Sequence, residues 1–144
     1  MSQEVKDGDR VKMVLVVRDK FTDAQGRVFG IRKGKVAVQA CHAATQFLLE
    51  KLRHPQNPRL CGSHAWTPVE QEWLDTGQTK ICCLVETEEL LLEVYARAKE
   101  AHLVTHLITD AASTELKEPT RTCLAIGPAR SSDVDRITGH LRLA

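Results

Sequence analysis

The residues best suited to chemistry lie where a helix or a strand is expected to begin or end. Lys35 falls in the first turn of an expected helix, close to two further cations, Arg32 and Lys33. Asp110 directly follows one apolar segment, and Thr122 begins another. An ammonium group at a helix start can hold a phosphate or stabilise a developing oxyanion. A carboxylate can act as a general base or position a water molecule, and a hydroxyl can hydrogen-bond to either.

Each of these side chains also has a purely structural interpretation. Lys35 could be a solvated surface lysine, Asp110 could cap the loop after its strand, and Thr122 could be an ordinary strand residue. The cations at the helix start repel the positive end of the helix dipole, a cost often tolerated where an anion binds. Residue types alone therefore indicate an anion site without naming a reaction.

His42 is the obvious candidate for a catalytic base, but a histidine between Cys41 and Ala43 on a helix is more often structural. Adjacent helical residues project about 100° apart, which disfavours Cys41 and His42 as a nucleophile pair. His102 and His106 straddle an expected helix–strand boundary, so no metal site is expected. The sequence has no glycine-rich phosphate loop, so we expect no nucleotide cofactor.

Apolar runs and their boundaries predict the elements that position these groups. We expect strands over residues 11–18, 80–86, 104–109 and 122–126, and helices over 34–54, 67–77, 87–101 and 131–139. Residues 19–30 indicate a loop or hairpin-like excursion, and residues 140–144 could form a strand edge. Alternating strands and helices predict a mainly parallel α/β sandwich, with the last two main strands antiparallel because no helix joins them.

The helix over residues 34–54 should separate packing from chemistry. Its packing face is expected to hold small and apolar residues, namely Val36, Ala37, Ala40, Cys41, Ala44, Phe47 and Leu48. Its polar stripe is expected to hold Lys35, Gln39, His42 and Gln46. In α/β sheets ligands collect at strand ends, where Arg18, Asp110 and Arg121 stand, so the helix start and these ends should lie close together.

The bulk composition bounds the class of protein. At 144 residues the chain fits one domain, which we place at residues 11–144 after a flexible leader at residues 1–10. A net charge of +1 argues against a uniformly basic surface but allows a local patch. The five cysteines have no disulfide spacing, and no segment resembles a signal peptide or a membrane span. We therefore expect a soluble, cytoplasmic protein.

Several segments, taken in order, resemble the archaeal and eukaryotic (type II) family of peptidyl-tRNA hydrolases. The signature is matched by Lys33-Gly34-Lys35-Val36-Ala37-Val38-Gln39 and His42-Ala43, and the later motifs by Asp110-Ala111, Thr120-Arg121-Thr122 and Ile126-Gly127-Pro128-Ala129. The resemblance covers roughly residues 12–143. It implies hydrolysis of the ester that joins a peptide to tRNA, a four-stranded mixed sheet in a three-layer sandwich, no metal or other cofactor, and often a homodimer.

The resemblance also assigns roles to particular residues. It implies that Lys35, Asp110 and Thr122 are catalytic. The same comparison implies that RNA is held by Arg32, Lys33, Gln39, Arg18 and Arg121, with His42 in a supporting part. Peptidyl-tRNA is then the expected partner, without a membrane.

The sequence departs from the family pattern in two places. Arg32 replaces a glycine, and about eight extra residues separate it from Arg18. The loop after Asp110 lacks the family's usual glycines and gains an acid at Glu115. Two alternatives therefore stand beside the hydrolase: a relative that binds RNA or protein without turnover, and a hydrolase of a different acyl ester.

Overall fold

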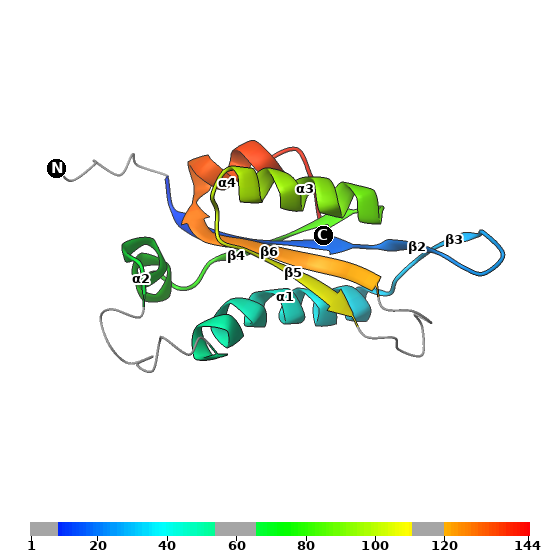
Figure 1. The fold of residues 1–144 in the computed structure, drawn as a ribbon, viewed down its shortest axis with the longest axis horizontal. Coiled ribbons are helices and arrows are strands. Elements are labelled where there is room, and N and C mark those ends of the chain that lie inside the picture. The colour runs from blue at the N-terminus through cyan, green and yellow to red at the C-terminus, as the bar shows by residue number, and fades with distance from the viewer. Residues whose placement is uncertain (1–8, 54–65, 111–119) are drawn as a thin grey trace.

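Three layers make up the fold in the computed structural model, which describes residues 9–53, 66–110 and 120–144 (Figure 1). The central sheet has the strand order β5-β6-β1-β4-β7, with strands β1 (Val11–Arg18), β4 (Lys80–Val85), β5 (Thr105–Asp110), β6 (Thr120–Arg130) and β7 (Arg142–Leu143). One face is covered by α1 (Lys33–Arg53), and the other by α3 (Glu88–Glu100) and α4 (Ser131–Thr138). The short helix α2 (Pro68–Asp75) lies at one end.

The α/β sandwich and its mixed sheet are confirmed, but the predictions of four strands and of a parallel majority are wrong. The sheet has five strands, and only the β1–β4 pairing is parallel, whereas β1–β6, β5–β6 and β4–β7 are antiparallel. Alternation with helices correctly implied that β1, β4 and β5 run in one direction. It did not reveal that β6 inserts between β5 and β1. The strand edge expected within residues 140–144 is confirmed as β7, which pairs with β4. The expected antiparallel neighbours, β5 and β6, are confirmed.

Strand β6 is also longer than expected. Gly127-Pro128 does not end it, because the strand continues to Arg130. Gly127 has a φ of 102°, and a Cβ at this position would lie 2.8 Å from the backbone oxygen of Lys12. The β1–β6 register shifts between Lys12 and Val14. A glycine therefore lets β6 pass this irregularity and span the whole sheet.

Two apolar cores hold the layers together, one on each face of the sheet. Alternate residues of β1 divide between them: Val14 and Val16 pack under α3 and α4, whereas Met13 and Leu15 face α1. Cys83 belongs to the first core and Cys82 borders the second, so these adjacent thiols point to opposite faces of the sheet.

The packing face of α1 is confirmed in part and is rotated toward Gln39. Four of the predicted packing residues lie in or against the core on this side of the sheet, namely Val36, Ala40, Ala44 and Phe47. The buried residues of the helix are Gln39, Ala43 and Phe47, whereas Cys41 and Leu48 are exposed. An amide at Gln39 reads as polar in a hydrophobic pattern, so the pattern rotated the expected packing face away from it. Burying an amide is costly unless its hydrogen bonds are satisfied, so Gln39 must find partners inside the protein.

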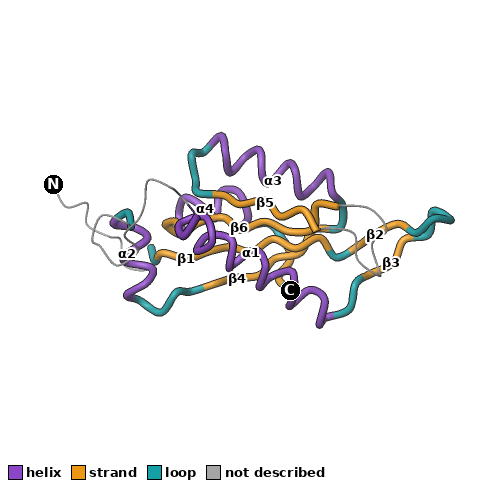
Figure 2. Tube along the Cα trace, turned by 60° about the horizontal axis from the view of Figure 1, so that its bottom comes forward, coloured by secondary structure: helices purple, strands orange, loops and turns teal. Residues whose placement is uncertain are grey.

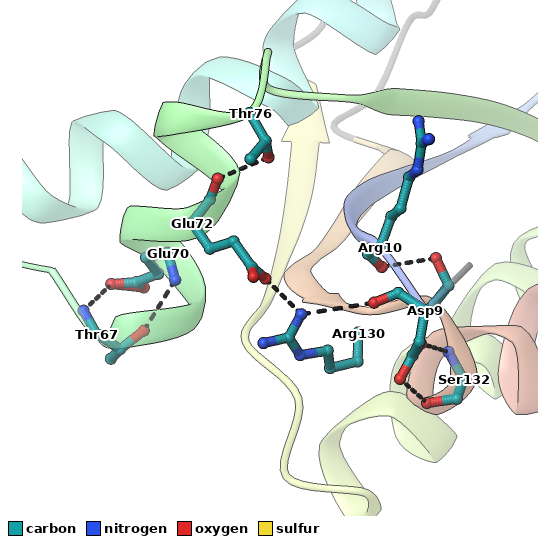
Figure 3. A network of polar contacts seen from close by, with 9 residues as sticks. Asp9, Arg10, Thr67, Glu70, Glu72, Thr76, Arg130 and Ser132 are labelled. Carbon is teal, nitrogen blue, oxygen red and sulfur yellow. Dashed lines mark hydrogen bonds and ion pairs between the residues drawn. The ribbon is translucent and has the colours of Figure 1, made fainter. Parts of the chain in front are cut away.

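The helix caps follow two different plans (Figure 3). Helix α2 begins with a capping box: the Thr67 side chain accepts from the Glu70 backbone N–H, and the Glu70 side chain accepts from the Thr67 backbone N–H. At the start of α4, the N-cap residue Arg130 makes no capping hydrogen bond with its side chain. Asp9 accepts hydrogen bonds from the backbone N–H and the hydroxyl of Ser132, at 2.9 and 3.0 Å, so the cap comes from a distant part of the chain.

Residues 19–30 contain a β-hairpin rather than a plain loop. Strands β2 (Lys20–Thr22) and β3 (Val28–Gly30) pair in an antiparallel two-stranded sheet that projects beyond the end of the main sheet (Figures 1 and 2). Phe21 and Phe29 lie opposite each other across it, and the Arg18 guanidinium lies 4.2 Å from the Phe21 ring centroid. The hairpin leads directly into the start of α1.

Candidate active site

A chain of polar contacts joins α1, β5 and β6 at one end of the sheet. The Nε2 group of Gln39 donates to Oδ2 of Asp110 at 2.9 Å, and the Thr122 hydroxyl donates to Oε1 of Gln39 at 3.1 Å. The ammonium of Lys35 lies 3.7 Å from the same Asp110 oxygen. The structure therefore brings together the three residues predicted to be catalytic and adds Gln39 as the link between them.

The backbone explains why these side chains meet. Lys35 and Gln39 are four residues apart on α1, so they occupy neighbouring turns on one side of the helix. Asp110 is the last residue of β5. The β5–β6 register changes between Ile108 and Thr109. Thr122 of β6, which has no partner in that register, faces α1 and reaches Gln39.

Burial divides the four residues of this polar network into an inner pair and an outer pair. Gln39 and Thr122 each retain only 1% of their accessible surface, whereas the side chains of Lys35 and Asp110 retain 26% and 19%. The inner pair is closed to solvent and contacts Asp110 through Gln39 from inside the protein, whereas the outer pair can contact solvent or a substrate. Because the Thr122 hydroxyl donates to the Gln39 oxygen, the Gln39 nitrogen is the group turned toward Asp110.

Cys123 completes the inner support. Its thiol donates to the backbone oxygen of Gln39 at 3.2 Å. Burial is the main reason that the pKa of Cys123 is raised to about 11, against the lowering effect of its hydrogen bond with Thr122. Since the nucleophile in cysteine chemistry is the thiolate, the buried Cys123 thiol is poorly suited to act as a nucleophile at neutral pH. Sequence reasoning passed over it because a thiol inside an apolar strand carries no distinguishing pattern.

Comparison with known proteins decides the family. The family model described as peptidyl-tRNA hydrolase PTH2 matches residues 11–144. The chain belongs to this family. It is 35% identical to a peptidyl-tRNA hydrolase of Methanocaldococcus jannaschii over 92% of this chain and 99% of the relative. It is 38% identical to one of Sulfurisphaera tokodaii, over 92% and 97%, and 36% identical to a probable peptidyl-tRNA hydrolase 2 of Drosophila melanogaster, over 94% and 62%.

The basic residues expected to contact RNA in this hydrolase family member fall into two groups. Arg32 and Lys33 are exposed at the start of α1, beside Lys35. Arg18 and Arg121 instead lie near Glu88 at the start of α3, with nitrogen–oxygen distances of 3.5 and 3.8 Å. They therefore stand at the same end of the sheet as the catalytic candidates but on its other face. Gln39 lies in neither group, because it is buried.

His42 does not join the polar chain among the described contacts. It is exposed on α1 and lines a shallow groove with Val38 and Ile108. Within residues 9–53, 66–110 and 120–144, no three His, Cys, Asp or Glu side chains cluster as metal ligands. No helix in those ranges is long and apolar enough to cross a membrane. The altered loop after Asp110 at residues 111–119 lies outside the described residues.

Proposed function

We propose that the protein hydrolyses the ester bond between a peptidyl, or N-blocked aminoacyl, group and tRNA, which returns the tRNA for reuse. The observation that carries this proposal is the Asp110 carboxylate, held at 2.9 Å by the buried Gln39 amide and faced at 3.7 Å by the Lys35 ammonium. A carboxylate beside a cation, both partly open to solvent, fits hydrolysis by an activated water. Membership of the PTH2 family names the substrate class.

In the proposed mechanism, Asp110 orients a water molecule and accepts a proton from it as the water oxygen adds to the ester carbonyl carbon. Negative charge then develops on the carbonyl oxygen, and Lys35 stabilises it. The bond from that carbon to the ribose oxygen breaks, and the ribose oxygen takes the proton held by Asp110 and becomes a hydroxyl. The peptide leaves as a carboxylic acid, which then loses its proton to water. The alternative role for Lys35 is to bind the terminal phosphate. A fall in kcat in Lys35→Ala would indicate charge stabilisation in the transition state, whereas a rise in KM with kcat unchanged would indicate phosphate binding.

We assign a positioning role to the two buried residues of the polar network, Gln39 and Thr122. Gln39 was predicted to contact RNA. Its burial and its hydrogen bonds with Asp110 and Thr122 instead support a role in orienting the Asp110 carboxylate. Thr122 was predicted to act on the reacting groups. Its hydroxyl donates to Gln39, so we place it one step behind Asp110. Positioning of this kind is valuable because displacements of about 1 Å in an active site can lower rates about a hundredfold.

We propose that RNA is held first by the exposed start of α1. Arg32 and Lys33 lie in sequence next to Lys35, and α1 has no acidic residue in its first turn. Arg18 and Arg121 are half-neutralised by Glu88, so we expect a weaker contribution from them. Phosphate contacts release counterions, so affinity for tRNA should fall steeply with salt concentration. A flat salt dependence would contradict this surface as the RNA contact.

The wider expectations also remain proposals. We propose that residues 11–144 form the hydrolase domain, with residues 1–10 a leader; of that leader, Asp9 and Arg10 contact α4. Action in the cytoplasm and assembly as a homodimer follow from the family resemblance. His42 keeps a supporting part.

The direct experiment measures release of N-acetyl-aminoacyl groups from tRNA by the wild type, Lys35→Ala and Asp110→Ala. We expect turnover by the wild type and a loss of about 10²-fold or more in each variant. A relative that only binds RNA would retain tRNA without releasing the acyl group. A hydrolase of another ester would cleave simple acyl esters but leave peptidyl-tRNA intact. Unchanged turnover by Asp110→Ala would contradict the site.

A further inference from the structure

An apolar groove runs along α1 directly beside the candidate active site. It has a volume of about 340 Å³ and is lined mainly by Val38, Cys41, Leu49 and Ile108, with His42 among its polar members. That volume lies at the lower end of the range for ligand pockets, roughly 300–1,000 Å³. None of the described residues that line it is Asp, Glu, Lys or Arg. The groove therefore suits an uncharged, apolar occupant.

Residues in both walls of the groove are close along the chain to the catalytic candidates. On α1, Val38 follows Lys35 by three residues and immediately precedes Gln39. On β5, Ile108 precedes Asp110 by two residues, which places both side chains on the same side of the strand. An occupant of the groove would thus have one end at the Lys35–Asp110 pair.

The residues of α1 differ on the two sides of the Lys35–Asp110 pair, and this difference indicates which part of a substrate would lie on each side. Toward the helix start lie the exposed cations Arg32 and Lys33, which suit the RNA. Toward the helix end lies the apolar groove, which extends as far as Leu49. A peptidyl-tRNA substrate has the same polarity, with a polyanion on one side of its ester and a peptide on the other.

We propose that this groove binds the peptide portion of the substrate and that it favours apolar side chains. The inference rests on the proposed function and adds to it the preferred class of peptide. From Ala37 to Leu49 the helix rises about 18 Å, enough for about five extended residues, of which alternate side chains would face the groove.

The adjoining strand supplies a second reason for this occupant. β5 is an edge strand of the sheet, paired only with β6 among the described strands. Backbone groups on an open strand edge can pair with an extended peptide whatever its sequence. Backbone pairing would allow peptides of many sequences to bind, and the apolar groove would favour those with apolar side chains.

The experiment compares kcat/KM for N-acetyl-Xaa-Xaa-Ala-tRNA substrates in which Xaa is Leu, Asp or Lys. We expect the wild type to prefer the Leu substrate over the Asp substrate by about tenfold or more. Val38→Glu places an acid in the groove at a position that is 48% exposed, which helps the variant to fold. It should lower the rate with Leu and raise the rate with Lys, so that their ratio inverts.

Two further variants keep the test decisive. Leu48→Glu lies on the same helix, is 41% exposed and does not line the groove, so its substrate ratios should match the wild type. Cys41→Glu, at a second lining position, should shift the ratios as Val38→Glu does. Ratios compare substrates on one enzyme, so partial unfolding of a variant does not imitate the expected result.

The contradicting outcomes are distinct. Equal rates for all three substrates would overturn the inference while leaving the hydrolase function intact. A uniform loss in Val38→Glu that follows weaker tRNA binding would show that the groove holds RNA instead. No hydrolysis of any substrate by the wild type would refute the proposed function and this inference together.

Discussion

Two polar clusters lie at opposite ends of β6, and they differ in how completely their groups are used. At one end, Arg130 forms an ion pair with Glu72 and lies 3.5 Å from the backbone oxygen of Asp9 (Figure 3). Both carboxylate oxygens of Asp9 accept from Ser132. At the other end, both α1 contacts of Asp110 go to Oδ2.

This difference indicates a structural role for the cluster around Arg130 and a catalytic role for the cluster around Asp110. The Arg130 end ties α2, β6, α4 and the beginning of the described chain into one unit. A carboxylate can accept about four hydrogen bonds, and the two α1 contacts of Asp110 share a single oxygen. Its cation stands at 3.7 Å, beyond a short hydrogen bond, and both side chains remain partly exposed. We therefore expect changes at the Arg130 end to alter stability and changes at the Asp110 end to alter turnover.

The largest effect expected from this contrast is that of Gln39→Leu. The substitution keeps side-chain bulk but removes the donor to Asp110 and the acceptor for Thr122. We expect kcat/KM for N-acetyl-aminoacyl-tRNA to fall about a hundredfold, because Asp110 loses its orientation. Leaving the Thr122 hydroxyl buried without an acceptor should also lower the free energy of unfolding by about 1–3 kcal/mol.

The matched control is Gln71→Leu, an exposed glutamine of α2 whose side chain bonds only locally to Asp75. Its activity should equal that of the wild type. If Gln39→Leu retained full activity despite losing stability, Gln39 would have a structural role, like the cluster around Arg130, rather than a role in the active site.

Thr122→Val should have a smaller effect. The side chain keeps its shape but no longer fixes which end of the Gln39 amide faces Asp110. We expect kcat/KM to fall about tenfold, with recovery in Thr122→Ser, which restores the hydroxyl. Steady-state kinetics on the three proteins would check this. Equal loss in the Ser and Val variants would indicate a packing role for the methyl group instead.

Asp9→Ala tests the structural cluster around Arg130. Loss of the carboxylate removes the cap of α4, so the free energy of unfolding should fall by about 1 kcal/mol. Chemical denaturation would measure this change. Activity at a temperature where the variant is folded should be unaltered, and a parallel drop in kcat would break the separation between the two ends.

His106 should give the smallest effect, and only in acid. Burial is the main cause that lowers its pKa from 6.5, against the raising effect of Glu50. As pH falls below about 6.5, the unfolded chain binds the proton first, so the free energy of unfolding decreases until the pH passes the lower native pKa. In His106→Leu this part of the acid destabilisation should be absent. An identical pH profile of stability for both proteins would contradict the assignment.

The sequence predicted most of the elements because local signals were strong. Thr67-Pro68 with Glu70 marked a helix start that the structure reproduces as a capping box. Strand adjacency was beyond local signals, since hydrophobic runs show that β6 exists but not that it inserts beside β1. The α4 cap was missed for the same reason: Asp9 lies 123 residues away from Ser132.

The candidate site shows the same limit. Strand-end and helix-start reasoning pointed to Lys35 and Asp110, and the structure places them together. The burial of Gln39 could not be read from its own segment, because a polar residue on an amphipathic helix is ordinarily assigned to the solvent face. Only the contacts with Asp110 and Thr122 show what offsets the cost of burying the amide.

The most direct test of the account is a double-mutant cycle between Lys35 and Asp110. It compares kcat/KM for N-acetyl-aminoacyl-tRNA in the wild type, Lys35→Ala, Asp110→Ala and the double variant. Residues that act as one catalytic unit have strongly non-additive effects, so the double variant should be about as slow as the slower single variant. Losses that multiply would show that the two groups act independently and would contradict a shared active site.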